Sequence, residues 1–337
     1  GPEAPLVAGV ADAVRAVGIP VFGPDAAAAR LEGSKAFAKD VMAAAEVPTA
    51  LAHLCTTIEQ VTDALDAFGA PHVVKDDGLA AGKGVVVTDD RETALAHAAE
   101  CLAKGGDAAV VIEEFLDGPE VSLFCLSDGV DVVPLAPAQD FKRIFDGDAG
   151  PNTGGMGAYS PLDWAPSDIS DQVVERVARP TVAELARRGA PFIGLLYVGL
   201  ALTSRGLRVI EFNARFGDPE TQVVLARLET PLDQALYAAA TGTLADLGPL
   251  RWSEGAAVTV VLATPGYPED PITGGVITGV DEAEAVEGAW VLHAGTALDG
   301  DSRLISAGGR VLSVVGTGPS LNEARGVAYE AASKISL

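Results

Sequence analysis

The sequence has 337 residues, which is enough for about two domains with large hydrophobic cores. Its 23 basic and 47 acidic side chains give a formal net charge of −24, so we expect the protein to repel nucleic acids and anionic lipid surfaces. Hydrophobic residues make up 48% and charged residues 21% of the chain, which is typical of a folded globular protein and excludes a disordered one.

The sequence predicts neither a membrane span nor cysteine crosslinks. Its longest apolar stretch, residues 192–202, is too short to cross a bilayer. Cys55, Cys101 and Cys125 are odd in number and far apart, so they favour neither a disulfide framework nor a zinc site, and we expect a cytoplasmic protein. Residues 1–3 include no initiating methionine and open no signal peptide, so we expect a fragment or a trimmed chain.

The first part of the chain alternates predicted helices with short strands, which is typical of an α/β protein. Apolar residues at helical spacing predict a helix over 6–17, and a short strand should follow at 19–22. Ser34 predicts the N-cap of a second helix. This helix should cover 35–45, and after it we expect a helix at 57–68, strands at 73–75 and 85–88, a helix at 91–104, a strand at 110–115 and a hairpin of 121–126 with 130–133.

The second part of the chain has a different pattern. Residues 146–168 are rich in Gly, Pro, Asn and Asp, which predicts a long irregular segment. Polar residues, glycine and proline near 245–254 indicate a domain boundary. The expected elements are a helix at 170–188, strands at 193–203 and 207–213, short antiparallel strands after 251 and a closing helix at 321–334.

A glycine-rich segment follows one of the buried strands. The strand ends near Lys75, and Gly78, Gly82 and Gly84 would let backbone amides approach an anion, with Lys83 beside them. The spacing differs from that of a P-loop, because a glycine stands where Ser or Thr would hold magnesium. The segment therefore favours phosphate binding, and a glycine-rich hairpin with incidental lysines is the alternative.

The stretch LRVIEFNAR places an acid and an amide on one strand. Because side chains alternate along a strand, Glu211 and Asn213 should share a face, and Val209 should lie on the same face. Two such oxygen ligands can hold Mg²⁺, which completes its shell with phosphate and water. The alternative is a sheet-edge acid paired with Arg208 or Arg215.

Two further segments carry charge at conspicuous places. Lys142 and Arg143 precede the glycine-rich residues 150–157, which suggests an anion site with a movable loop, although a solvated basic pair is the simpler alternative. Glu113 and Glu114 end a strand and could face a base and ribose, or could simply be solvated. Only seven lysines accompany sixteen arginines, and six of the seven precede residue 143, so a retained lysine suggests a site that needs a compact charge.

Taken together, these segments resemble the phosphoribosylamine-glycine ligase (glycinamide ribonucleotide synthetase) family of ATP-grasp enzymes. The matching strings, in family order, are GPEAPLV at 1, FGP at 22, LEGSKAFAKD at 31, KDDGLAAGKGV at 75, IEEFLDGPE at 112, GPNTGGMGAYSP at 150, EFNARFGDPETQ at 211 and HAGT at 293. The resemblance implies de novo purine biosynthesis, with glycine and 5-phosphoribosylamine as substrates. Glycine would attack ATP to give glycyl phosphate, whose carbonyl the amine of phosphoribosylamine would attack, with Mg²⁺ or Mn²⁺ as the metal.

The resemblance also implies roles for individual residues. ATP would contact Lys35, Lys75, Gly78, Gly82, Lys83, Gly84, Glu113, Glu114, Leu116 and Glu120. Glu211 and Asn213 would bind the metal, and Arg215 and Lys142 would be catalytic. The substrate contacts would be Gly1, Pro2, Glu3, Arg143, Asp218 and Glu220.

The resemblance implies an α/β and α+β protein built around an ATP-grasp core. We expect a truncated N-terminal Rossmann-like remnant at 1–31, an ATP-grasp domain at 32–245 with a small nucleotide lobe at 72–133, and a mostly antiparallel C-terminal β domain at 250–337. We also expect a monomer that binds small molecules, without nucleic-acid or membrane partners.

The sequence departs from the family pattern in a few places. Asp76 stands where a small residue is more common, Phe141 stands where histidine is frequent, and the opening strand and a GREHA-type loop are absent. Two alternatives therefore stay open: another ATP-grasp carboxylate-amine ligase, or a nucleotide-binding fragment without full catalysis.

Overall fold

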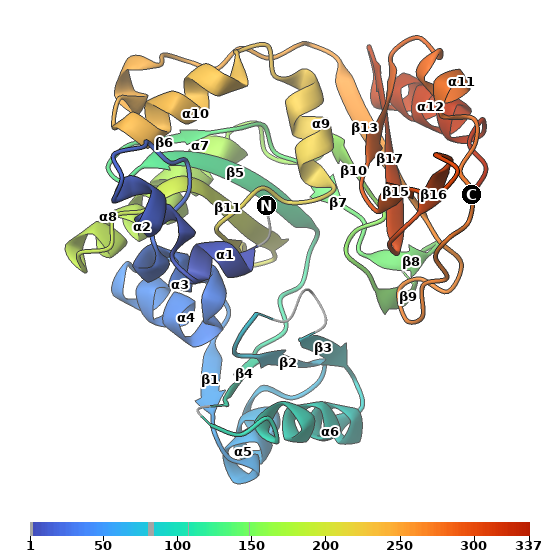
Figure 1. Cartoon of the computed structure of the whole chain (residues 1–337). Helices are drawn as coiled ribbons and strands as arrows, with labels where there is room; N and C mark the ends of the chain where they lie inside the picture. Colours follow the sequence, from blue (N-terminus) through green and yellow to red (C-terminus); the bar gives the residue numbers. More distant parts are fainter. Residues whose placement is uncertain (1–2, 80–83, 107, 148) are drawn as a thin grey trace. The chain divides into compact units, whose positions relative to one another are not determined.

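The computed structural model describes residues 3–79, 84–106, 108–147 and 149–337, and its elements are drawn in Figure 1. The chain divides into two compact units. Unit 1 comprises residues 1–135, 168–216 and 233–248, and unit 2 comprises residues 136–167, 217–232 and 249–337. Each unit therefore combines stretches that are far apart in the sequence. The domains expected from the sequence, at 1–31, 32–245 and 250–337, do not correspond one to one to these two units, and that division stays a prediction.

Of the two four-stranded sheets in unit 1, the one with the longer strands is antiparallel and has the strand order β12-β11-β5-β6. Its central strands are buried along most of their length, and fully buried side chains such as Phe124, Leu126 and Leu196 form the core. The predicted hairpin and strand pair are confirmed. The elements are β5 (Glu120–Asp128), β6 (Val132–Pro134), β11 (Ile193–Thr203), β12 (Gly206–Asn213), α7 (Ile169–Val173), a π-helical turn (Val174–Ala178), α8 (Arg179–Arg187), α10 (Leu232–Thr241) and a 3-10 turn (Leu244–Asp246).

The N-terminal segment is helical, but it differs from the sequence prediction in two places. The helix expected over 6–17 is interrupted at Gly9, whose φ of 88° is left-handed. The strand expected at 19–22 is absent, because Arg15 donates hydrogen bonds to the carbonyls of Val21 and Gly23, at 3.0 and 2.5 Å. The helices are α1 (Glu3–Val7), α2 (Val10–Arg15), α3 (Ala26–Gly33) and α4 (Lys35–Ala44).

The Ser34 cap is confirmed, because its hydroxyl accepts the Phe37 N–H at the start of α4.

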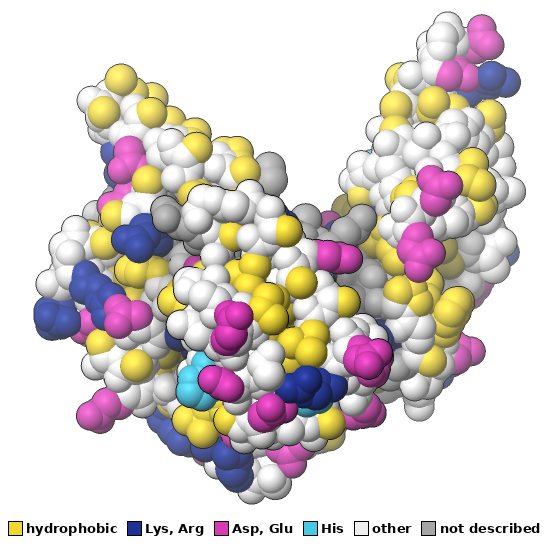
Figure 2. Space-filling view, turned by 90° about the horizontal axis from the view of Figure 1, so that it is seen from below, with side chains coloured by type: hydrophobic (Ala, Val, Ile, Leu, Met, Phe, Trp, Pro, Cys, Tyr) yellow, Lys and Arg dark blue, Asp and Glu magenta, His cyan; other side chains and the backbone are white. Residues whose placement is uncertain are grey.

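A second antiparallel sheet in unit 1, with the order β1-β4-β2-β3, forms a small lobe with α5 and α6. The two helices pack their buried faces on this sheet, through residues such as Leu65, Ala98 and Ile112 (Figure 1). On the face of the molecule that Figure 2 shows, acidic and basic side chains are interspersed. The predicted elements are confirmed as α5 (Ile58–Phe68), β2 (His72–Asp76), β3 (Val85–Thr88), α6 (Arg91–Leu102) and β4 (Val110–Glu113). The strand β1 (Ala52–Cys55) was not expected.

Unit 2 is built on a five-stranded antiparallel sheet with the order β14-β17-β13-β10-β7. The segment expected to be irregular, 146–168, contains the two strands β9 and β10. Their hydrogen-bond partners lie outside that segment, because β9 pairs with β8 and β10 pairs with β13 and β7. The elements are β7 (Gln139–Asp140), β8 (Arg143–Phe145), β9 (Ala149–Asn152), β10 (Gly157–Ser160), α9 (Glu220–Arg227), β13 (Ala256–Ala263), α11 (Val280–Glu284), β14 (Ala289–His293), β15 (Thr296–Leu298), β16 (Leu304–Ser306), β17 (Arg310–Gly318) and α12 (Leu321–Ala332).

Within the ranges described, none of the helices has the length and apolar character needed to cross a membrane.

Candidate functional site

A buried acid binds two lysines in unit 1. The Glu113 carboxylate, at the end of β4, lies 2.8 Å from Lys75 Nζ on β2 and 3.0 Å from Lys39 Nζ on α4. The side chains of Glu113 and Lys75 are only 4% and 5% exposed. Lys39 also donates to the Thr49 hydroxyl and the Ala50 carbonyl, both at 2.9 Å. Glu113 therefore fixes the position of the strand lysine and joins the small lobe to α4.

Lys35 lies at the base of the glycine-rich loop. Its ammonium donates to the backbone carbonyls of Asp76 and Gly78, at 2.8 and 3.1 Å. Burial lowers the pKa of Lys35 below its usual value, and the nearby Glu211 carboxylate opposes that effect. The Asp77 carboxylate accepts the Ala36 N–H at 2.9 Å and a hydrogen bond from the Ser34 hydroxyl. The loop base is thus attached to the N-terminus of α4.

The two oxygen ligands predicted on β12 follow a β-bulge. Gly199 pairs with Glu211 and Leu200 pairs with Val209, so Ile210 is the extra residue. The prediction that Val209 shares a face with Glu211 is wrong, because the bulge places Val209 among the buried residues while Glu211 and Asn213 are half-buried. The Ile210 carbonyl accepts a hydrogen bond from Lys75 at 3.1 Å. The bulge therefore brings β12 next to the phosphate-binding candidate.

A divalent metal at this end of β12 would need more ligands than the protein side chains supply. Glu211 and Asn213, two positions apart, lie on the same side of the strand and offer a carboxylate and an amide oxygen. No cluster of three or more His, Cys, Asp or Glu side chains suited to a metal occurs in the part of the chain that the structure describes. A magnesium-type ion at these two residues would take its remaining ligands from phosphate and water, which is common for nucleotide sites.

Arg215 follows β12 and lies in an acidic setting. Its Nε lies 3.3 Å from the Glu32 carboxylate and 3.8 Å from that of Glu3. Glu32 also accepts the Ala214 N–H at 2.7 Å. Burial raises the pKa of Glu32, with Arg215 acting in the opposite direction. The side chain of Arg215 is 30% exposed, so it is oriented by these acids and remains accessible.

The residues predicted around adenosine lie just after β4. The Glu114 carboxylate accepts the Leu51 N–H at 3.0 Å and binds Arg205 at 2.9 Å. Burial acts to raise the pKa of Glu114, but the hydrogen bonds from the Leu51 N–H and from Arg205 together outweigh it and hold the pKa below its usual value. Leu116 is half-buried, and Glu120 begins β5.

Four further predicted residues, Lys142, Arg143, Asp218 and Glu220, lie in unit 2. Arg143 donates to the Gly150 carbonyl at 2.6 Å across the β8–β9 hairpin, and Lys142 Nζ lies 3.9 Å from Asp140. Asp218 is 48% exposed, whereas Glu220 on α9 is only 4% exposed. Gly1, Pro2, Gly82 and Lys83 lie outside the described residues.

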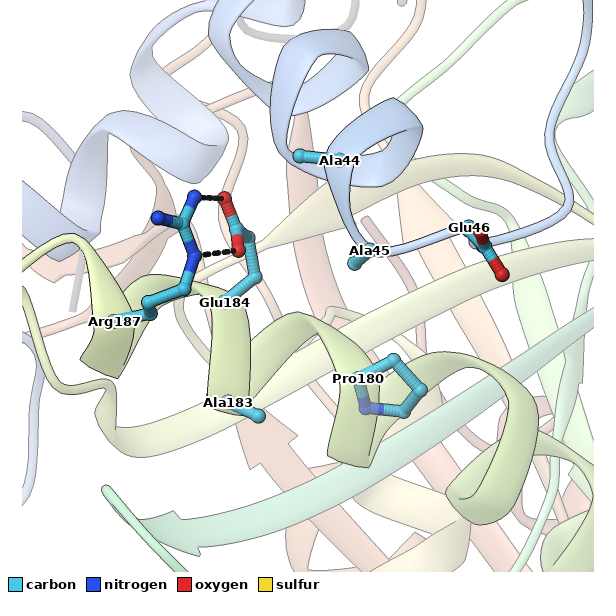
Figure 3. A pocket seen from close by; sticks show the side chains of 7 residues that line it. All are labelled: Ala44, Ala45, Glu46, Pro180, Ala183, Glu184 and Arg187. Carbon is cyan, nitrogen blue, oxygen red and sulfur yellow. Dashed lines mark hydrogen bonds and ion pairs between the residues drawn. The ribbon is translucent and has the colours of Figure 1, made fainter.

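A separate surface cavity of about 320 Å³ lies in unit 1 between the end of α4 and α8 (Figure 3). Its charged lining residues are Glu46, Glu184 and Arg187, and the last two bind each other through two hydrogen bonds of 2.7 Å. None of its lining residues belongs to the predicted site.

Sequence reasoning missed several residues that organise this site. Glu32 and Lys39 stand in the string LEGSKAFAKD, but only their tertiary partners reveal a role. Asp77 adjoins the glycine-rich loop, and its bond to α4 could not be read locally. The lysine count was a useful signal, since Lys35, Lys39, Lys75 and Lys104 all bind residues of the small lobe.

Solved structures establish the class of protein to which this architecture belongs. The chain resembles a biotin carboxylase from Campylobacter jejuni with a TM-score of 0.75 and 15% identity, over 96% of this chain and 71% of that one, which shows the fold alone. It resembles a phosphoribosylamine–glycine ligase from Thermotoga maritima with a TM-score of 0.85 and 38% identity, over 94% of this chain and 79% of that one. The protein has the ATP-grasp fold, as the sequence resemblance predicts.

Sequence comparisons define the family. Profiles described as the N, ATP-grasp (A) and C domains of phosphoribosylglycinamide synthetase match residues 1–32, 33–221 and 257–337. A phosphoribosylamine–glycine ligase from Streptomyces coelicolor is 68% identical over 100% of this chain and 80% of its own length, and one from Mycobacterium tuberculosis is 60% identical over 100% and 79%. The chain belongs to the phosphoribosylglycinamide synthetase family and is an ATP-grasp ligase, so the expected family and enzyme class are confirmed.

Proposed function

We propose that the protein joins glycine to 5-phosphoribosylamine and converts ATP to ADP and phosphate, in de novo purine biosynthesis. The observation that carries this proposal is the family match along the whole chain, together with the lysines and the Glu211–Asn213 strand that unit 1 brings together. Membership of this family removes the case for another ATP-grasp carboxylate-amine ligase.

The phosphates of ATP would lie beside Lys35 and Lys75. Both ammonium groups already bind backbone carbonyls around the loop base and the β12 bulge, at Gly78 and Ile210, so their positions are set before the nucleotide arrives. A preorganised cation loses little conformational freedom when it binds a phosphate. Glu113 fixes the Lys75 ammonium. Glu113 would therefore act as a positioning residue for Lys75, in addition to its predicted contact with the adenosine.

Mg²⁺ or Mn²⁺ would be held by Glu211 and Asn213 and would neutralise phosphate charge when bound. In the first half of the reaction, a carboxylate oxygen of glycine bonds to the γ-phosphorus of ATP as ADP leaves. The amine of phosphoribosylamine then bonds to the carbonyl carbon of glycyl phosphate, loses a proton and displaces phosphate. Arg215, which Glu32 orients at 3.3 Å, would stabilise the charge of the transferring group.

Phosphate release tests the proposal. Release from Mg·ATP should require both glycine and phosphoribosylamine, and Glu211→Ala should lower the rate by about 100-fold or more. The control variant is Glu330→Ala, which removes an exposed acid of α12 and should have wild-type rates.

Release that is indifferent to both substrates, or unchanged in Glu211→Ala, would refute the assignment. A Mg·ATP titration with Lys75→Ala as comparison separates the remaining alternative. Nucleotide binding that depends on Lys75 without any substrate-dependent release would identify a nucleotide-binding fragment.

A further inference from the structure

An arginine from the C-terminal part of unit 2 binds two segments that the sequence analysis treated separately. The guanidinium nitrogen Nη1 of Arg310 lies within hydrogen-bond distance of the carbonyls of Gly154, Gly155 and Asp218. It also lies 3.3 Å from the Asp218 carboxylate atom Oδ1. Arg310 begins β17, so the central sheet of unit 2 supports these contacts (Figure 1). The side chain is 23% exposed, which makes it a partly shielded charge.

The loop that contains Gly154 and Gly155, residues 153–156, makes further contacts within unit 2. The Gly154 N–H donates to the Tyr267 hydroxyl at 2.8 Å. Gly155 has a φ of +102°, and a Cβ at this position would lie 2.4 Å from Cδ of Pro219. The loop therefore packs directly on the turn that carries Asp218, and no larger residue fits at Gly155 without movement.

The backbone donors of this loop are already used inside unit 2. The N–H groups of Thr153 and Met156 donate to the carbonyls of Lys142 and Phe141, and that of Gly155 donates to the Thr153 hydroxyl. An anion would find no backbone N–H available at positions 153–156, because the N–H of Gly154 is taken as well. The loop is thus a support for neighbouring groups.

The Asp218 carboxylate is the group that this support leaves available. Its Oδ1 accepts from Gln222 Nε2 at 3.0 Å and faces Arg310, whereas Oδ2 has no bonding partner among the described residues. The side chain is 48% exposed. A carboxylate oxygen without a protein partner, on a partly exposed side chain, suits an ammonium group. Glycine carries its amino group as an ammonium at neutral pH, whereas phosphoribosylamine needs a neutral amine in order to attack.

We propose that Arg310 is a positioning residue for glycine: it holds the Gly154–Gly155 turn and the Asp218 carboxylate together, so that Asp218 Oδ2 receives the glycine ammonium. This inference rests on the proposed function. It assigns a role in glycine recognition to a residue that lies outside every motif used to identify the family.

Steady-state kinetics of the protein with ATP, glycine and phosphoribosylamine test the inference. Asp218→Asn and Arg310→Ala should each raise the KM for glycine by about tenfold or more, since each removes a charge-assisted contact. The KM values for ATP and phosphoribosylamine should stay within about twofold of wild type. Arg310→Lys should be affected less than Arg310→Ala, because all the contacts use one nitrogen that an ammonium can partly replace.

A double variant separates positioning from a general structural role. If Arg310 acts through Asp218, Arg310→Ala combined with Asp218→Asn should raise the KM for glycine no further than Asp218→Asn alone. Tyr267→Phe keeps the ring and removes the acceptor of the Gly154 N–H, so it should give a smaller increase in the same KM. The matched control is Arg303→Ala, which removes an arginine that is 59% exposed and pairs with Asp299 in the same part of the chain.

Each other outcome counts against the inference. A wild-type KM for glycine in Arg310→Ala or in Asp218→Asn overturns it, and so does an equal rise in every KM. If Arg310→Ala does not fold, an unchanged KM for glycine in Tyr267→Phe and Arg310→Lys overturns it. A wild-type protein whose phosphate release ignores glycine would instead remove the proposed function, which keeps the two failures distinct.

Discussion

Replacing Glu113 by glutamine should destabilise unit 1 by an amount that its burial makes large. The glutamine keeps the volume of the side chain and removes its charge, so it leaves no cavity. Lys75, 5% exposed, and Lys39, 15% exposed, then keep their charges without a carboxylate between them. A neutral amide has one oxygen to offer, so it can accept a hydrogen bond from one ammonium while its own NH₂ group faces the other.

The expected cost follows from this geometry. Breaking a buried ion pair by removing one partner costs about 3–5 kcal/mol. Lys39 retains Thr49 and Ala50 as acceptors and Lys75 retains the Ile210 carbonyl, so we place the loss of unfolding free energy at the lower end, about 3 kcal/mol. With a urea dependence of about 1–3 kcal/mol per molar, the midpoint should fall by about 1–3 M.

Two optical probes can assign the change to unit 1. The three tryptophans of the chain, Trp164, Trp252 and Trp290, all lie in unit 2, so their fluorescence reports that unit, whereas far-UV circular dichroism reports both. The urea transition of Glu113→Gln should move in the circular dichroism more than in the fluorescence. The matched control is Glu114→Gln, whose carboxylate is 17% exposed and pairs with an arginine that is 50% exposed, and it should lose about 1 kcal/mol or less. Equal midpoint shifts for the two variants would refute the reasoning.

Two further predictions concern pH and helix capping. The hydrogen bonds from Arg187, and then from Arg188, lower the pKa of Glu184 from 4.5 to about 2, so the stability that this carboxylate contributes is present above pH 4.5 and is lost as the pH falls towards 2. The difference in Tm between wild type and Glu184→Gln should close over that window, and a gap that persists at pH 2 contradicts this. Ser34→Ala removes the cap of α4 and the bond to Asp77, so the free energy of unfolding followed by circular dichroism should fall by about 1 kcal/mol. Ser320→Ala, at the cap of α12 in unit 2, should instead shift the unfolding transition followed by fluorescence. An unchanged free energy of unfolding in Ser34→Ala would show that its cap is not stabilising.

Some of the site was predictable because its signals are local. The cap at Ser34 is a bond between residues three apart, and apolar strands bounded by glycines placed β2 and β3 on either side of the loop. The strings that carry Lys35, Lys75 and the Glu211–Asn213 pair resemble a family, and the comparisons confirm that family. The ligand roles of these residues stay predictions, because phosphate and metal contacts depend on bound molecules.

The sequence by itself determined the ATP-grasp family, the elements of the small lobe other than β1, the boundaries of α4, α5 and α6 to within two residues, and the acid–amide pair on β12, because periodicity, caps and short motifs act over a few residues. Only the tertiary structure decided that Val209 faces the core beside a bulge, that Glu113 holds two lysines, and that Arg310 binds the loop at Gly154. The contacts of Glu113 and Arg310 join residues between 38 and 156 positions apart in the chain, such as Lys75 with Glu113 and Arg310 with Gly154. No local pattern encodes such pairings, since they depend on which strands and helices pack together once the whole chain has folded.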